Sequence, residues 1–329
     1  MERSDRQPDA VGASDSRISG RAAWFERRKR MEAGNEKHTP RAIEEQRHWV
    51  AFRQMLALFG LMLRICGLYE RGVRNARNVR LKRLDLGFQD LPAEFDGFRI
   101  LHLSDLHVDF LPETLDAALE LVSGARIDIC VLTGDYRKRV SGSFAHILPD
   151  IERLVAQIGA QIGAQEQARG GIYAILGNHD CADMVPAFEG IGIEVLVNET
   201  RRIQRGRAHI HLTGTDDVHY YYTEAARAAL ETAPAGFKIA LVHSAELADV
   251  AAEAGFQLYL AGHTHGGQIC LPGGHPIITH MSTHRRYASG LWRHDAMVGY
   301  TTTGVGVSGL PVRLNTRGEA VLITLNRSS

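Results

Sequence analysis

Five short motifs that carry aspartate, histidine or asparagine side chains occur in order across about half of the chain. Carboxylate, amide and imidazole groups in one mixed set suit divalent manganese, iron or zinc. Two such ions about 3.5 to 4 Å apart can activate a bridging water and hold the attacking and leaving oxygens of a displacement at phosphorus. One carboxylate must then bridge the ions, and we assign that position to Asp135. The motifs are Ser104–His107 (SDLH), Gly134–Asp135 (GD), Gly177–Asp180 (GNHD), Val242–Ser244 (VHS) and Gly262–His265 (GHTH).

The positions of these motifs matter more than their letters, because each motif alone is common by chance. A short apolar run, of the kind that forms a buried strand, stands before every motif, and the fifth run is the weakest. Ligands of α/β proteins bind beyond the carboxyl ends of the strands, so the five motifs are expected to converge on one place. The runs are Arg99–Leu103, Ile129–Thr133, Ile172–Leu176, Ile239–Val242 and Gln257–Ala261.

The order of the motifs resembles the signature of the calcineurin-like metallophosphoesterase superfamily, from roughly Phe98 to Leu325. The resemblance implies an α/β fold with a two-sheet β-sandwich and flanking helices, whereas periodicity alone predicts only α/β. It implies that His179 faces the phosphate, where it stabilises charge or protonates the leaving group. Asp180 is expected to have a supporting role. The implied ligands are Asp105, His107, Asp135 and His265 for one metal and Asp135, Asn178, His243 and His263 for the other.

The longer string at Gly262–Pro272 looks like a narrower branch, membrane-associated bacterial phosphoesterases that include enzymes acting on UDP-2,3-diacylglucosamine. VNET at Val197–Thr200 and GTDD at Gly214–Asp217 agree with that branch. The residues after Asp135 lack the Asp-Arg-Gly of protein serine/threonine phosphatases, which disfavours that group. Ala245 stands where this branch is expected to carry proline, a departure that removes no ligand.

Composition divides the chain into three parts, residues 1–48, 49–78 and 79–329. The first part is charged and poor in large aliphatics, so we expect a disordered or partly helical extension, with a helix near Arg21–Ala33. A twin-arginine export signal at Arg27 and Arg28 is disfavoured, because no apolar stretch soon follows. The four cysteines form no Cys-x-x-Cys pair, which fits a reducing compartment.

Residues Trp49–Tyr69 are apolar apart from a narrow stripe that contains Arg53 and Arg64, which predicts an amphipathic helix rather than a membrane span. Such a helix lies in the membrane interface or packs on the catalytic domain, and both alternatives stay open. A following basic cluster favours the membrane, because each basic residue gains about 1 kcal/mol near anionic lipid. The alternative interpretation of this basic cluster is a helix face exposed to solvent. It consists of Arg71, Arg74, Arg77, Arg80, Lys82 and Arg83.

The catalytic domain should begin near Val79 with a strand at Arg80–Leu86. We expect a strand at His209–Thr213, and we expect Met297–Thr303 and Ala320–Leu325 to finish the second sheet. The tandem Ala-Gln-Ile-Gly repeat in Ala156–Gln167 is expected at a helix end or in a loop. Helices are predicted at Pro112–Val122, Ser143–Gln157, Thr223–Thr232 and Glu246–Ala254.

Several further polar residues have two interpretations each. His102 and His211 lie inside predicted strands, so we expect them to pack. His219 with its neighbouring tyrosines, and the run His275–His284, are candidates to line a substrate groove. Arg313 either reaches a phosphate or anchors the last strand.

The function predicted from these observations is a two-metal hydrolase of phosphoester or pyrophosphate bonds that uses a metal-bridging hydroxide, with manganese, iron or zinc as the two divalent ions. The expected partners are a phosphorylated or nucleotide-linked lipid, such as UDP-2,3-diacylglucosamine, and a membrane surface bound by residues 49–83. The alternatives are a phosphodiesterase for a soluble nucleotide and a non-catalytic scaffold. A formal net charge of zero argues against nucleic acid. The expected location is cytoplasmic, peripheral on the inner face of the cell membrane.

Overall fold

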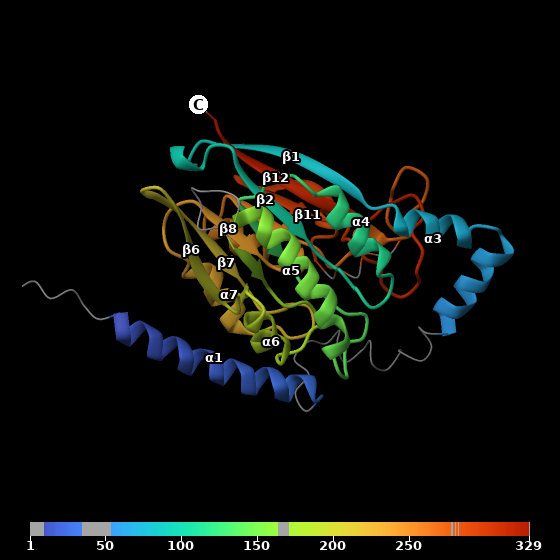
Figure 1. Cartoon of the computed structure of the whole chain (residues 1–329), viewed down its shortest axis with the longest axis horizontal. Coiled ribbons are helices and arrows are strands. Elements are labelled where there is room, and N and C mark those ends of the chain that lie inside the picture. The colour runs from blue at the N-terminus through green and yellow to red at the C-terminus, as the bar shows by residue number, and fades with distance from the viewer. Residues whose placement is uncertain are drawn as a thin grey trace, which may run out of the picture.

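The computed structural model describes residues 10–34, 54–163, 171–277, 279, 281 and 283–328. Two six-stranded sheets face each other, and helices cover their outer faces (Figure 1). The first sheet has the order β1 (Arg80–Phe88), β12 (Glu319–Arg327), β2 (Phe98–Leu103), β3 (Ile129–Leu132), β4 (Ile172–Ala174) and β5 (Ile193–Val195). The second has the order β10 (Gly290–His294), β11 (Met297–Thr301), β9 (Leu258–Ala261), β8 (Lys238–Leu241), β7 (Ala208–Gly214) and β6 (Glu199–Arg205).

The layers of the fold follow from the way side chains alternate between the two faces of the central strands. In β2, Phe98 and Ile100 belong to the cluster between the sheets, while Leu101 and Leu103 belong to the cluster beneath the helices. Successive side chains of a strand point to opposite faces, so an apolar run of this kind can be buried on both sides. The sandwich predicted from the resemblance is confirmed.

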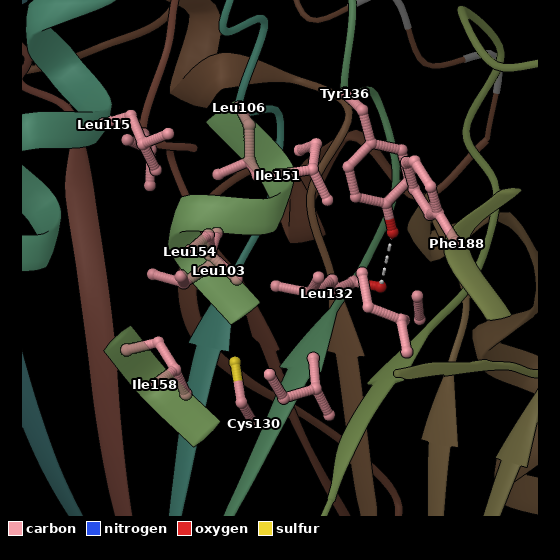
Figure 2. Close-up of a cluster of buried hydrophobic side chains, with 14 of the residues drawn as sticks. Leu103, Leu106, Leu115, Cys130, Leu132, Tyr136, Ile151, Leu154, Ile158 and Phe188 are labelled. Carbon is pink, nitrogen blue, oxygen red and sulfur yellow. Dashed lines mark hydrogen bonds between the residues drawn. The ribbon is translucent and has the colours of Figure 1, made fainter. Parts of the chain in front are cut away.

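Among the described residues, three helices pack on the outer face of the first sheet and two on that of the second. Figure 2 shows the first of these clusters, in which Leu154 and Ile158 lie over Leu103 and Cys130. The helices on the first sheet are α4 (Glu113–Leu121), α5 (Leu148–Gly163) and α6 (Met184–Gly190), and those on the second are α7 (Glu224–Glu231) and α8 (Ala248–Glu253).

The strands that precede the five motifs are those expected from the apolar runs. Strands β2, β3 and β4 run parallel in one sheet, and β8 and β9 run parallel in the other. All five motifs therefore follow carboxyl ends of parallel strands, as expected for a ligand site. The helices predicted at Pro112–Val122, Thr223–Thr232 and Glu246–Ala254 are α4, α7 and α8 with small shifts at their ends.

One strand assignment was wrong. Residues Ala320–Leu325 do not finish the second sheet but lie in the first, between β1 and β2. The reason is burial on both faces: Val321 and Ile323 pack between the sheets, and Leu322 packs on the helix side. Local sequence shows a strand, but its choice of sheet depends on these long-range contacts.

Short elements with mixed polarity were not predicted. They are α6, β5, β6 and β10. Helix α5 begins later than Ser143 and continues into the Ala-Gln-Ile-Gly repeat as far as Gly163, and residues 164–170 lie outside the described part of the chain. His102 and His211 are buried in strands, as expected.

The N-terminal part contains three described helices. Helix α1 spans Ala10–Glu32, which is longer than the predicted helix near Arg21–Ala33, and it runs along the catalytic domain (Figure 1). Residues 54–65 form a second helix, and α3 (Tyr69–Arg77) a third. No helix in the described ranges has the length and hydropathy that a membrane crossing requires.

The prediction of one helix through Tyr69 was wrong. Helix 54–65 ends where Gly67 takes a φ of 69°. The Gly67 N–H donates to the Arg64 carbonyl at 3.0 Å and the Leu68 N–H donates to the Leu63 carbonyl at 2.8 Å. This paired pattern is a Schellman motif, which ends helices at a left-handed glycine. Residues 49–53 lie outside the described residues.

Candidate metal centre

The motif loops bring two groups of potential metal ligands together. Within each group the donor atoms lie within 4.8 Å of one another, and all six residues are buried. His265 Nε2 lies 3.5 Å from Asp105 Oδ1, and His243 Nε2 lies 3.5 Å from Asp135 Oδ2. The first group is Asp105, His107 and His265, and the second is Asp135, His243 and His263.

Asn178 completes the second group of predicted ligands, and Asp135 lies close to both groups. Asn178 Oδ1 lies 3.0 Å from His263 Nδ1 and 3.2 Å from His243 Nε2, which adds the amide oxygen to the second group. Asp135 Oδ2 lies 3.7 Å from His107 Nε2 of the first group as well as close to His243. Asp135 therefore stands between the groups, where a bridging carboxylate would have to be.

The hydrogen bonds behind the imidazoles fit a metal centre. His107 Nδ1 lies 2.8 Å from the Arg137 carbonyl, and His243 Nδ1 lies 2.6 Å from the Thr133 carbonyl. A carbonyl can only accept, so each Nδ1 carries a proton, and Nε2 is the nitrogen that presents its lone pair to the site when the ring is neutral. Metal-binding histidines have this arrangement, in which a partner outside the site fixes the tautomer. These residues therefore fit divalent cations, one beside each group.

Five of the seven predicted ligands have a left-handed backbone. Residues other than glycine rarely adopt positive φ, and holding each one there costs about 1 to 3 kcal/mol that the surrounding structure must offset. Such strain concentrates at functional sites. The φ values are 50° for Asp105, 38° for His107, 61° for Asp135, 70° for His263 and 50° for His265.

Two motif glycines are required by close packing. A Cβ on Gly177 would clash with the Asp135 carboxylate and with His243, and a Cβ on Gly262 would clash with Ser104 and the Asp105 carboxylate. A side chain at either position would thus displace a predicted ligand. Gly177 and Gly262 are therefore points where the backbone approaches the ligands closely.

Charge and burial set the protonation of the site. Burial alone would raise the pKa of the Asp135 carboxyl, but the surrounding histidines, His243 first, outweigh burial and hold that pKa well below its usual range. Burial raises the pKa of Asp105 to about 6 and lowers the pKa of His107 to about 4. Charged Asp135 and neutral His107 are the forms that bind a cation.

His179 differs from the ligands in being reachable from solvent. Its side chain is 18% exposed, and its Nε2 lies 3.9 Å from Asp135 Oδ2. The Lys138 carbonyl accepts from His179 Nδ1 at 2.6 Å, which leaves Nε2 toward the centre. This geometry suits a side chain that faces a phosphate, and that role stays a prediction.

Asp180 supports the loops without joining the ligands. Its carboxylate accepts the backbone N–H groups of Asp135 and Gly177 at 2.7 Å and of Tyr136 at 3.0 Å. Tyr136 is held in turn by a hydrogen bond from its hydroxyl to the Ile175 carbonyl and by Phe188, whose ring lies beside it in Figure 2. The supporting position expected for Asp180 is thus the one observed.

The remaining candidates behave differently from the ligands. Arg313 is fully buried and donates to the carbonyls of His265 and Gly306, so it anchors loops and does not reach outward to a phosphate. His219 is buried, with its ring centroid 4.1 Å from that of His263, and its role in a substrate groove stays a prediction. His284 stacks on the Tyr287 ring, and residues 278, 280 and 282 of the His275–His284 run lie outside the described residues.

Sequence reasoning missed the carbonyls of Thr133, Arg137 and Lys138, which fix the imidazoles, because backbone groups leave no trace in a sequence. It also missed the contacts of Arg28 in α1 with the loop that carries Asn178 and with the loop that follows β7. The disfavoured twin-arginine pair does not point to these contacts, so only the three-dimensional arrangement identifies them.

Comparisons with known proteins agree with this site. An uncharacterised metallophosphoesterase, YkoQ of Bacillus subtilis (strain 168), is 27% identical over 75% of this chain and 90% of its own length. The phosphodiesterase YaeI of Escherichia coli (strain K12) is 29% identical over 69% of this chain and 82% of its own. A transmembrane protein with metallophosphoesterase domain from Danio rerio is 28% identical over 88% of this chain and 66% of its own.

A family model gives the assignment directly. The model of the calcineurin-like phosphoesterases matches residues 98–267, which run from β2 to the GHTH loop and include every predicted ligand. Members of this family are metal-dependent hydrolases, and both ligand groups are present here. The chain belongs to the calcineurin-like phosphoesterase family and is a metal-dependent phosphoesterase.

Proposed function

We propose that this phosphoesterase cleaves a phosphodiester or pyrophosphate bond of a membrane lipid, with UDP-2,3-diacylglucosamine as the first candidate. The observation that carries the proposal is the apolar outer face of helix 54–65. Ile65 is 77% exposed and Leu58 is 68% exposed. Monomeric proteins rarely leave such a stripe uncovered unless it binds something. The exposed apolar residues are Met55, Leu58, Leu61, Met62, Ile65 and Leu68.

Charge selects a lipid surface as the occupant. Arg71 and Arg74 of α3 and the other four residues of the basic cluster are exposed, directly after the apolar stripe. An apolar stripe beside exposed cations matches a bilayer interface with anionic headgroups, where each cation adds about 1 kcal/mol. The inner face of helix 54–65 packs on the domain, since Leu63 and Gly60 are buried. The inner face thus has the packing on the domain that was one of the two alternatives, and membrane binding by the outer face stays a proposal.

One loop connects this helix to the metal centre. Helix 54–65 approaches Gly309 with Leu56 and Leu310 with Gly60. The same loop begins at the centre, where the Gly306 N–H donates to the Asp105 carbonyl at 2.8 Å. The helix thus packs on a loop that begins at the ligands, which supports a substrate that reaches the centre from a membrane surface.

The residues of the site would divide the reaction among them. When two divalent ions are bound, they supply an activated water and neutralise charge on the phosphoryl oxygens. Asp180 and Arg313 fix the loops of the site through hydrogen bonds to the backbone. The ligands Asp135, Asn178 and the buried histidines are therefore held in place. His179 Nε2 lies toward the centre, where it can donate a proton to the departing oxygen.

A vesicle-binding experiment tests the lipid surface. Leu58→Glu and Ile65→Glu place charges on the exposed stripe, and we expect each to lower the fraction that floats with vesicles of phosphatidylethanolamine and phosphatidylglycerol. Leu291→Glu is the matched control, because Leu291 of β10 is 55% exposed on another element. Equal flotation of all four proteins would contradict the proposed surface.

The substrate is tested by hydrolysis of UDP-2,3-diacylglucosamine beside bis(p-nitrophenyl) phosphate, using metal-stripped protein with manganese added back. Metal-dependent cleavage of both, much faster for the glycolipid, supports the proposal. Cleavage of the simple diester alone would keep the phosphoesterase and reject the lipid. A soluble nucleotide diester cleaved faster than the glycolipid would favour the alternative substrate.

A further inference from the structure

Helix α1 inserts a charged side chain between the catalytic loops. Arg28 is 1% exposed, and its guanidinium forms an ion pair with the buried carboxylate of Asp216. It also donates to the Asp180 carbonyl at 2.9 Å and lies over the Tyr221 ring, 3.5 Å from the centroid. Glu32, one turn along α1, accepts from Arg28 Nε at 3.1 Å. Arg28 thus has partners on every side of its planar group.

The first loop that Arg28 contacts follows β4 in the first sheet. Asp180 in this loop accepts the N–H groups of Asp135 and Gly177, as described above. The Ala182 N–H of the same loop donates to Glu32 at 2.7 Å. Helix α1 therefore holds the backbone on which Asn178 and Asp135 depend.

The second loop follows β7 in the second sheet. Asp216 receives the Trp24 indole N–H at 2.7 Å in addition to Arg28. The next residue, Asp217, accepts the N–H groups of His219 at 3.1 Å and Tyr220 at 2.8 Å. The His219 ring lies against the predicted ligand His263. Arg28 therefore joins loops from two different sheets, and each loop is one contact away from a ligand.

Attachment of α1 does not by itself require a buried charge. The helix already has pairs at its surface, between Lys29 and Asp183 at 2.5 Å and between Arg21 and Glu199 at 3.0 Å. Taking a guanidinium out of water is costly, and its gain in well-attested cases is specificity of arrangement rather than stability. Its position between the two loops is the arrangement that it specifies.

We propose that α1 is a positioning element of the metal centre and that Arg28 is its positioning residue. Arg28 holds the Asp180 loop and the Asp216 loop in register across the two sheets, and through them it sets the second group of ligands. The proposal rests on the metal centre and is independent of the lipid substrate.

The test is manganese binding by the full-length, metal-stripped chain, measured by titration calorimetry. We expect Arg28→Ala to weaken the affinity by about tenfold, at the lower end of the effect of outer-shell partners of metal ligands. Arg27→Ala is the matched control, because the neighbouring Arg27 is exposed on the same helix, and its affinity should stay within about twofold. A role limited to attaching α1 would change the melting temperature and leave the affinity of the folded protein unchanged.

Arg28→Lys keeps the test informative if the alanine variant does not fold. Lysine retains the charge beside Asp216 but cannot reproduce the planar fork that also reaches the Asp180 carbonyl and Glu32. We expect a weakened affinity between those of Arg28→Ala and the wild type. Wild-type affinity in a folded Arg28→Lys variant would overturn the role of α1. Failure of the wild-type chain to bind manganese would overturn the metal centre itself, and this inference with it.

Discussion

The metal-centre loops and helix 54–65 both depart from the usual pattern of buried apolar and exposed polar side chains, but in opposite ways. The loops bury charged Asp135 and polar His243, whereas the helix exposes large apolar side chains such as Ile65. A buried charge and an exposed apolar stripe both cost free energy unless a partner compensates. The difference therefore indicates two kinds of partner: cations for the loops and, as we propose, a lipid surface for the helix.

The two N-terminal helices differ in the same way. Helix α1 meets the catalytic domain through a buried arginine and surface ion pairs, while helix 54–65 meets it through Gly60 and Leu63 and leaves its other face uncovered. Polar contacts specify one arrangement, and an apolar face is less selective. The comparison supports our two proposals: α1 positions the ligand loops, and the outer face of helix 54–65 binds a lipid surface.

The largest effect should follow from changing the residue between the two ligand groups. Asp135→Asn replaces the carboxylate that stands between the two groups, so turnover of bis(p-nitrophenyl) phosphate should fall by more than about 100-fold, beyond the range for outer-shell residues. The melting temperature measured by circular dichroism should stay near that of wild type. Asp90→Asn, an exposed aspartate in a turn, is the control. A near-normal rate for Asp135→Asn would contradict the site.

A smaller effect should show that α3 packs on the catalytic domain, in contrast to the exposed outer face of helix 54–65. A Cβ on Gly72 of α3 would lie 2.7 Å from Val312 Cβ, so Gly72→Ala should destabilise the protein by about 1 to 3 kcal/mol. Gly159→Ala in α5 meets nothing within 4 Å and should be neutral or stabilising by up to about 1 kcal/mol. Urea unfolding of both variants measures the difference, and equal stabilities would mean that α3 is not packed as described.

The smallest effect concerns acid sensitivity beneath the metal centre. Burial lowers the pKa of His102 from 6.5 to about 3, so the unfolded chain binds a proton that the folded chain excludes. Stability from this group is complete above about pH 6.5 and is lost as pH falls toward 3. Between pH 7.5 and 5.5 the wild type should lose about 1.4 kcal/mol relative to His102→Gln, which can keep the contact to Thr133. A pH-independent difference in unfolding free energy would contradict this.

The sequence predicts the strands beside the motifs well, because buried strands must be apolar on both faces and the loops that follow them must be polar. An apolar run as short as Ile129–Thr133 is too short for a typical helix and therefore indicates a strand. The position of β12 was not predictable in this way, since Val321 and Leu322 fit either sheet and only contacts with β1 and β2 decide. Short strands such as β6 alternate too weakly to be found.

The candidate site shows the same division. Aspartate and histidine ligands are identifiable because their types and spacing carry the chemistry. The strained φ of Asp105 and the carbonyls that fix His107 and His243 are features of the backbone, so they cannot be predicted from residue types. Arg28 lies 188 positions from Asp216, and nothing near either residue in the sequence links them.

The central claim is that the two ligand groups bind two metal ions that catalyse phosphoester hydrolysis. It is tested most directly by adding manganese to metal-stripped protein while counting bound ions and following hydrolysis of bis(p-nitrophenyl) phosphate. The account predicts about two ions per chain, with activity absent from the stripped protein and rising as both sites fill. Binding of fewer than two ions at full activity, or hydrolysis by fully stripped protein, would contradict it.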